Sequence, residues 1–217
     1  MLFINEVECK PTGRNIIGGE VYFSPVVQNT DEWMQLRIGR ITASSFAKIF
    51  MGKNTKGYKE FITQKALERI LGERQDEEIN GGWLERGHDL EPQAREEYEL
   101  LTFTEVQSDG FYFNNWVGVS PDGMTADGMI EIKCPKHTNH LKSLIERKVP
   151  AQYIHQVGSQ MYITGANYCD YVSFHPDYNT LIKREVRNPA YEKELEENLR
   201  AAIIDIQSEV EKLKNLV

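Results

Sequence analysis

Two acidic side chains and one lysine are spaced in a way that suits metal-dependent chemistry. Asp122 lies in the turn-forming segment 120–123 (SPDG), and eight residues separate it from the tripeptide EIK at 131–133. Because side chains alternate between the two faces of a strand, Glu131 and Lys133 point to the same side. A hairpin of this length returns Glu131 to Asp122, so the sequence predicts that two carboxylates and a lysine converge at one strand pair.

Such a set of side chains is suited to the hydrolysis of phosphodiester bonds. The hard carboxylate oxygens of Asp122 and Glu131 are expected to hold Mg²⁺, or Mn²⁺ in its place, and to leave coordination positions for water and substrate. The cation stabilises charge on the phosphate and lowers the pKa of a bound water. Lys133 orients that water or helps to deprotonate it, and the nearby positive charge is expected to depress the pKa of the lysine.

A plainer structural interpretation competes with this one. An E-x-K tripeptide is common on the exposed face of a β-hairpin, where Glu131 and Lys133 would simply be solvated. The SPDG segment at the right distance before the tripeptide favours a site over an exposed hairpin.

Hydrophobic periodicity and turn residues predict the elements that position these side chains. Asp31 and Thr42 are expected to cap the first two helices. Helices are expected at 31–39, 42–50, 58–72, 83–101, 139–148, 151–164 and 189–216. Strands are expected at 111–115, 116–120, 129–135, 169–176 and 180–187, and residues 1–28 show no strong period.

The order of these elements predicts the fold class. Helices, strands, helices and more strands in turn favour an α/β (α+β) fold with one central mixed β-sheet flanked by helices. We expect a single domain over 1–217, with its core at about 30–188 and a C-terminal helix at about 189–216. The apolar stripe of that last helix is expected to pack on its own domain, and a contact between subunits is the alternative.

Charge is distributed unevenly along the chain. The net charge of −8 taken alone leans against nucleic acid as a partner. Residues 189–217, however, carry seven acidic and four basic side chains, and residues 37–74 are rich in arginine and lysine. An acidic helix can thus coexist with a basic cleft elsewhere.

Composition also indicates a compartment. The chain has three cysteines, Cys9, Cys134 and Cys169, which are widely spaced and are expected to be free thiols. The first residues lack the basic start and apolar run of a signal peptide, and no apolar run is long enough to span a membrane. We therefore expect a cytoplasmic protein with no membrane partner.

At this point the sequence resembles a known family. The segments SPDG and EIKCP resemble the PD-(D/E)xK nucleases, in particular the group of the phage lambda exonuclease and the YqaJ-like viral recombinases. Three further blocks are similar to motifs of that group and occur in its order: WMQLRIGRITASSF at 33–46, RGHDLEPQAREEY at 86–98 and YIHQVGSQMYITG at 153–165. Four ordered motifs are more specific than one and cover most of the chain.

The resemblance implies a fold, an activity and partners. The fold would be the restriction-endonuclease-like core. The activity would be a 5′-to-3′ exonuclease that digests one strand of double-stranded DNA and leaves a 3′ overhang for a phage single-strand annealing protein. The enzyme would be a homotrimer, a ring of three subunits that encloses the DNA in the cytoplasm of a bacterial host.

The same resemblance implies roles around the cation. Asp122 and Glu131 would be metal ligands together with the backbone carbonyl of Ile132, and Lys133 would be the catalytic lysine. Glu91 would lie near the metal, as a ligand or just behind the ligands. Without the resemblance, Glu91 could simply be a solvated residue of an acidic helix.

Other residues would, by resemblance, contact DNA. Arg37 would pair with the 5′-terminal phosphate, a task that suits a planar guanidinium. Ser44 and Ser120 would donate hydroxyl hydrogen bonds to phosphate, and Gln156 would face the metal. Leu84 matches an apolar wedge that splits the terminal base pair, although a core leucine is the plainer interpretation. Arg37 as a surface helix residue and Ser44 bonding its own backbone are the corresponding alternatives.

One position departs from the family pattern. The group often carries Gln-x-Gln in the third block, and here Gln156 is followed by Val157 and Gly158. Gln160, one turn beyond Gln156, lies on the same helical face and is the candidate replacement.

Two other patterns are not expected to be functional. Cys134, His137 and His140 have the spacing of metal ligands but lack a fourth, and three dispersed cysteines do not make an iron–sulfur site. No phosphate-binding loop of the G-x-x-x-x-G-K-[ST] type is present, so no ATP-driven motor is encoded.

Two alternative functions stay open. One is another nuclease with the same core, acting as an endonuclease or on single strands. The other is a catalytically silent DNA-binding scaffold, against which the intact Asp122, Glu131 and Lys133 argue.

Overall fold

The computed structural model describes residues 2–4, 7–75, 82–107 and 110–216, and within 2–4 and 82–88 it describes the backbone alone. The helices are α1 (Asp31–Arg37), the 3₁₀ helix η1 (Ala43–Ser45), α2 (Phe46–Ile49), α3 (Lys56–Leu71), α4 (Gly82–Thr102), α5 (His137–Glu146), α6 (Ala151–Thr164) and α7 (Pro189–Lys214). The strands are β1 (Leu2–Ile4), β2 (Val7–Ile16), β3 (Gly19–Ser24), β4 (Ile41–Thr42), β5 (Phe111–Phe113), β6 (Val117–Val119), β7 (Gly123–Met124), β8 (Gly128–Lys133), β9 (Tyr168–Ser173) and β10 (Leu181–Val186).

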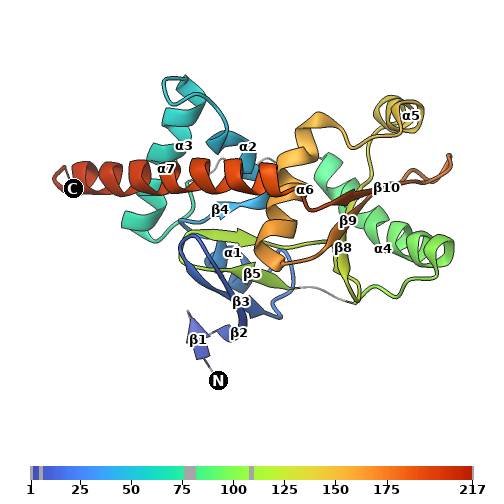
Figure 1. The fold of residues 1–217 in the computed structure, drawn as a ribbon, viewed down its shortest axis with the longest axis horizontal. Coiled ribbons are helices and arrows are strands. Elements are labelled where there is room, and N and C mark those ends of the chain that lie inside the picture. The colour runs from blue at the N-terminus through green and yellow to red at the C-terminus, as the bar shows by residue number, and fades with distance from the viewer. Residues whose placement is uncertain (1, 5–6, 76–81, 108–109, 217) are drawn as a thin grey trace.

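The described strands form two mixed sheets. One has the order β1-β2-β3-β5-β6-β4 and the other has the order β10-β9-β8-β7. The β4–β6 and β8–β9 pairs are parallel and the remaining pairs are antiparallel. The expected class, mixed β structure flanked by helices, is confirmed (Figure 1). The expectation of one central sheet is wrong, because the pairing partners change between β6 and β7.

That change of partner takes place within 120–122. Pro121 has no N–H to donate to a ladder, so the strand cannot continue with regular pairing through this residue. Beyond it, the Asp122 N–H donates to the carbonyl of Ile130 over 3.2 Å, which starts the pairing of β7 with β8. The segment 117–124 therefore runs from one sheet into the other and carries Asp122 at the junction.

The four-stranded sheet is covered by a helix on each face. On one face, Ile130 and Ile132 of β8 pack with Ala94 and Tyr98 of α4. On the other face, Met129 packs with side chains of α6. Since side chains alternate along β8, residues 131 and 133 point toward the α6 side.

The helices α3, α6 and α7 close the other core. Figure 1 shows α7 running across α3, and α6 contacts both α7 and strands of the two sheets. Leu195, Leu199 and Ile206 of α7 are fully buried in this core. The apolar stripe of the last helix thus packs on its own chain. No helix among the described residues is long and apolar enough to cross a membrane.

Most expected elements are confirmed, with shifted ends. The first helix is capped by Thr30, not by Asp31, because the Thr30 hydroxyl accepts from the Trp33 N–H over 3.3 Å. The expected helix at 42–50 is divided into η1 and α2. Residues 1–28, which lack a periodic pattern, contain β1, β2 and β3 among their described parts.

Candidate active site

Glu131 is the central side chain of the candidate site. It lies in β8 between β7 and β9, opposite Tyr171 in the parallel register, and is fully buried. A buried carboxylate is costly unless donors satisfy it. Lys133 Nζ and Gln156 Nε2 both donate to Oε1, and Gln160 Nε2 donates to Oε2 over 2.9 Å. Lys133 reaches the Glu131 carboxylate because alternate residues of β8 share one face of the sheet. Gln156 and Gln160 reach it because they are one turn apart on the same face of α6.

Asp122 is held beside Glu131 by the backbone of β8. Its Oδ2 accepts a hydrogen bond from the Ile132 N–H over 2.6 Å. Burial raises the pKa of the Asp122 carboxyl well above its ordinary value of 3.8, and the charge of Glu131 raises this pKa further. Glu91 adds to that rise, and Lys133 opposes it. The arrangement therefore concentrates more negative charge than the lysine alone neutralises.

Lys133 responds to the same charges. Burial lowers its pKa, but the carboxylates of Glu131 and Asp122 outweigh burial, so the pKa lies above its ordinary value of 10.5. The protein side chains alone thus raise the pKa of Lys133, whereas a nearby positive charge was expected from the sequence to lower it. The ammonium also lies 5.4 Å from the ring centre of Tyr153 on α6.

Helix α4 supplies the third carboxylate. Glu91 is about a quarter exposed, and its Oε1 lies 3.6 Å from the Arg95 guanidinium. Arg95 in turn donates to the backbone carbonyl of Asp122. Sequence reasoning missed Arg95, although it is four residues after Glu91 and therefore on the same helix face.

The donor set fits a hard divalent cation. Asp122, Glu131 and Glu91 offer carboxylate oxygens, and hard oxygen ligands are those that Mg²⁺ prefers. The excess negative charge around Asp122 is the electrostatic condition that such a cation relieves. Asp122, Glu131 and Glu91 would hold it, with the Ile132 carbonyl as the further ligand expected from the resemblance.

Arg37 and Ser120 lie on one path that leads to Asp122. The Arg37 guanidinium carbon lies 4.0 Å from the ring centre of Trp33, which is four residues earlier on α1. Trp33 Nε1 donates to the Ser120 hydroxyl over 2.7 Å, and Ser120 precedes Asp122 by two residues. Trp33 opens the block at 33–46 that carries the resemblance, but no role of its own was expected for it from the sequence.

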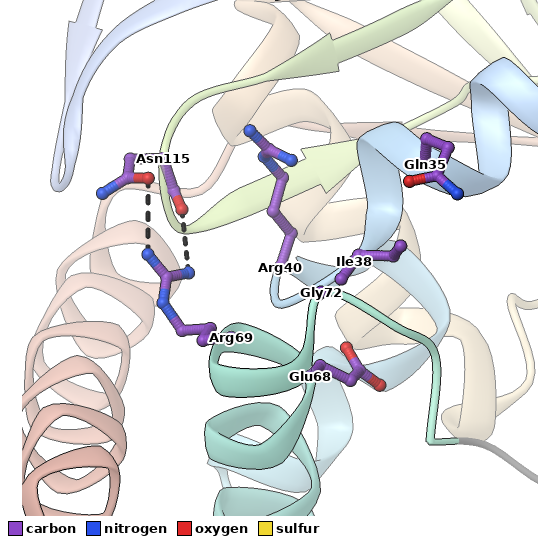
Figure 2. Close-up of a pocket in the computed structure, with 7 residues that line it drawn as sticks. All are labelled: Gln35, Ile38, Arg40, Glu68, Arg69, Gly72 and Asn115. Carbon is purple, nitrogen blue, oxygen red and sulfur yellow. Dashed lines mark hydrogen bonds between the residues drawn. The ribbon is translucent and has the colours of Figure 1, made fainter. Parts of the chain in front are cut away.

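The turn after α1 is clamped by the C-terminal end of α3. Gly39 has a φ of 67°, and its N–H donates to Oε2 of Glu68 over 2.9 Å. Arg69 donates to the Gly39 carbonyl over 2.8 Å and to the Asn115 carbonyl over 3.1 Å. A pocket of about 380 Å³ is lined by residues on both sides of this turn, among them Ile38, Arg40 and Arg69. Figure 2 shows Arg69 and Asn115 joined by two hydrogen bonds at this pocket. The clamp fixes the end of the helix that carries Arg37.

Gln156 and Gln160 face Glu131, and the family's second amide position does not. A Cβ at Gly158 would lie 2.3 Å from Cε1 of Tyr191, so the ring from α7 occupies the space that a glutamine there would need. Gln160 is fully buried and also donates to the Ser120 carbonyl over 3.2 Å.

The remaining residues expected from the sequence either make no described contact with the candidate site or have side chains that lie outside the described residues. Ser44 is exposed on η1, and no described contact joins it to Asp122 or Glu131. The side chain of Leu84 lies outside the described residues. His140 is buried, with Nδ1 at 2.8 Å from the Ser173 hydroxyl and Nε2 at 3.1 Å from the Asn179 carbonyl oxygen. Both of its ring nitrogens are thus engaged, and it does not join His137 in a metal-ligand set.

Comparison with known proteins gives a consistent result. The model of the YqaJ-like viral recombinase domain family matches residues 32–167. The alkaline exonuclease LHK-Exo from Laribacter hongkongensis is similar over 86% of this chain and 97% of its own, with 30% identity and a TM-score of 0.77. Its complex with dAMP gives 31% identity and a TM-score of 0.78 over the same shares.

A more distant structure shares the fold. The phage-related exonuclease from Haemophilus somnus 129PT has 16% identity and a TM-score of 0.62, over 81% of this chain and 95% of its own. No curated protein sequence matches this chain.

Proposed function

The chain belongs to the YqaJ-like viral recombinase domain family, and on this premise we propose that it is a magnesium-dependent exonuclease that digests one strand of duplex DNA from its 5′ end. The observation that carries the proposal is the convergence of Asp122, Glu131 and Lys133 at the junction of the two sheets. The 3′ overhang that such digestion leaves would serve a single-strand annealing protein.

Each side chain of the site has a chemical task in this proposal. Asp122, Glu131 and Glu91 bind the cation, and the buried position of Glu131 keeps its oxygens from bulk water. When bound, Mg²⁺ supplies charge stabilisation at the phosphate and acidifies a coordinated water. Lys133 orients the attacking water from the same face of β8. Gln156 and Gln160 hold the Glu131 carboxylate in one orientation, as hydrogen bonds behind a metal ligand do.

The preference for a 5′ end rests on Arg37. Its guanidinium stacks on Trp33, which leaves the planar fork fixed in direction, and such a fork suits a terminal phosphate. Trp33 donates to the Ser120 hydroxyl, so the proposed phosphate contact is linked to the segment that carries the proposed cation ligand Asp122. Ser120 and Ser44 are the proposed hydroxyl donors to the DNA backbone.

The decisive experiment uses linear duplex DNA with one 5′-phosphorylated, labelled strand and Mg²⁺. We expect stepwise release of mononucleotides from the 5′ end by the unaltered chain, no release by Asp122→Ala, and normal release by Asp127→Ala. Asp127 is an exposed carboxylate in the same hairpin and serves as the matched control. Chelation should abolish the activity, and Mg²⁺ or Mn²⁺ should restore it.

Other outcomes would reassign the protein. Cleavage of a covalently closed circle, lost in Asp122→Ala, would indicate an endonuclease with the same catalytic set. Digestion restricted to single strands would indicate a single-strand nuclease. DNA binding without cleavage under any divalent cation would indicate a scaffold.

The resemblance also leads us to propose a closed ring of three copies around the DNA. A head-to-tail contact that closes after three subunits would keep the enzyme on its substrate without an ATP-driven motor. Light scattering on the purified chain should give three times the monomer mass of 25.0 kDa. A monomer at micromolar concentration would contradict the ring.

A further inference from the structure

A second group of potential metal ligands lies at the ends of β8 and β9. His137 is the first residue of α5, four residues after Lys133, and His175 and Asp177 follow β9. Each of the three offers one ligand atom, and these atoms lie within 4.8 Å of one another. The ring centres of His137 and His175 are 4.2 Å apart. His137 thus meets two residues that follow it by 38 and 40 positions in the sequence.

The group combines one fixed ligand with two adjustable ones. His175 is only 2% exposed, and its Nδ1 lies 3.7 Å from Oδ2 of Asp177. His137 and Asp177 are exposed, so they can rotate and are open to an ion from solvent. The Asp177 N–H donates to Nδ1 of His175 over 3.2 Å, a long bond that a cation at this nitrogen would replace. Tetrahedral sites place neighbouring ligand atoms roughly 3.3 Å apart, given metal–ligand bonds of about 2.0 to 2.1 Å. Modest rotations of the two exposed side chains close the remaining gap.

The ligand chemistry differs from that of the site at Asp122. Two imidazoles and one carboxylate suit zinc and its neighbours among the transition metals, whereas Mg²⁺ takes oxygen ligands. Three protein ligands leave one position for water. We propose that His137, His175 and Asp177 bind a single zinc-class ion, which ties the start of α5 to the turn between β9 and β10.

This ion has a structural consequence near Lys133. The Phe174 N–H already donates to the Lys133 carbonyl over 2.9 Å, which holds the end of β8 against the end of β9. A metal at His137 and His175 would add a second tie four residues further along the chain, at the start of α5. The chain between Lys133 and α5 is then fixed at both ends, and unfolding of this region is opposed by metal binding. The site shares no ligand with Asp122, Glu131 or Glu91.

The test uses the full chain without an affinity tag, stripped of metal, in the Asp122→Asn background, so that the oxygen-ligand site contributes little. Co²⁺ is added with excess Mg²⁺ present, and the visible absorption of tetrahedral Co²⁺ is followed. We expect a saturable signal at one ion per chain, and a rise of several degrees in the unfolding midpoint with Zn²⁺. His137→Ala and Asp177→Asn should lose the signal or weaken binding at least about tenfold.

A matched histidine control is His155→Ala on α6, which should retain both the Co²⁺ signal and the Zn²⁺ response. Circular dichroism without metal checks that each variant is folded. The proposal is overturned if the metal-free chain shows no Co²⁺ signal and no Zn²⁺ shift, or if His137→Ala binds as tightly as the control. None of these readouts depends on DNA cleavage, so the metal site and the proposed nuclease stand or fall separately.

Discussion

Gln160 donates a hydrogen bond from Nε2 to Oε2 of Glu131 over 2.9 Å. Gly158, where the resemblance leads one to expect a second amide, lies half a turn earlier on α6 against the Tyr191 ring. The same Gln160 amide also reaches the Ser120 carbonyl, so one side chain joins the two stretches that carry the carboxylates.

Removing the Gln160 amide should weaken the proposed cation site. In Gln160→Ala, Glu131 loses a donor and its carboxylate can turn away from the cation. We expect the Mg²⁺ concentration for half-maximal cleavage to rise about 10- to 100-fold. Gln152→Ala, an exposed position on the same helix, is the control and should leave it unchanged. An unchanged Mg²⁺ requirement in Gln160→Ala would show that this hydrogen bond does not position Glu131.

Restoring the second amide at Gly158 should destabilise the fold. Gly158→Gln forces the new side chain into the Tyr191 ring, at a cost of about 1 to 3 kcal/mol in the free energy of unfolding. Combining it with Tyr191→Ala should be less harmful than the sum of the two single changes, because the smaller residue makes room. Urea unfolding of all four proteins measures the coupling, and strict additivity would contradict the steric explanation.

Loss of the indole N–H should reduce discrimination at DNA ends. Trp33→Phe keeps a ring beneath Arg37 but removes the hydrogen bond to Ser120. We expect the rate ratio between 5′-phosphorylated and 5′-hydroxyl ends to fall several-fold, with a smaller fall than in Arg37→Ala. Initial rates on two duplexes that differ only in the 5′ group provide the measurement. An equal loss on both duplexes would assign Trp33 to packing alone.

Breaking the buried ion pair between Lys65 and Glu68, next to the turn after α1, should lower the free energy of unfolding. Glu68 is 1% exposed and Lys65 Nζ lies 2.8 Å from its Oε2. Glu68→Ala leaves a buried ammonium without its partner and removes the acceptor of the Gly39 N–H. We expect a loss of about 3 to 5 kcal/mol by urea unfolding, and partial recovery when Lys65→Met is added. No recovery in the double variant would mean that the Gly39 contact accounts for the loss.

Low pH should remove the contribution that Asp205 on α7 makes to the stability of the fold. Burial raises its pKa, but hydrogen bonds from Lys53 and Tyr58 outweigh burial and hold the pKa below 3.8. A carboxyl with a lowered pKa stabilises the fold above its unfolded value and loses this effect as the pH falls through its folded value. Asp205→Asn should therefore cost about 1 kcal/mol at pH 7 and progressively less below about pH 4. A pH-independent difference in urea unfolding would contradict the assignment.

What could be predicted from the sequence was local. The helix that carries Gln156 and the strand that carries Glu131 follow from apolar periods within a few residues. The placement of Asp122 beside them follows from the length of one hairpin. Strand β2 was not predicted because most of the residues after Cys9 are exposed or only partly buried, so apolar and polar residues do not alternate there.

The contacts that were missed join residues far apart in the sequence. No sequence pattern around Gly158 predicts its contact with Tyr191. No spacing in the sequence predicts that His137 lies near His175 or that Gly39 contacts Glu68. The period of the apolar residues indicates which face of a helix or strand is buried, but it does not indicate which other element packs against that face. These contacts depend on how whole helices lie across the sheets, and that is decided by the sum of the core packing.

The junction at 120–122 has a mechanical consequence. Trp33 donates a hydrogen bond to the side-chain hydroxyl of Ser120, Pro121 restricts rotation at the next residue, and Asp122 follows directly. A displacement of α1 would therefore be passed to Asp122 through the Ser120 side chain and two peptide units. In the proposed nuclease, a DNA end placed badly at Arg37 would therefore shift the proposed cation ligand Asp122, and the accuracy of end recognition would affect the rate of hydrolysis.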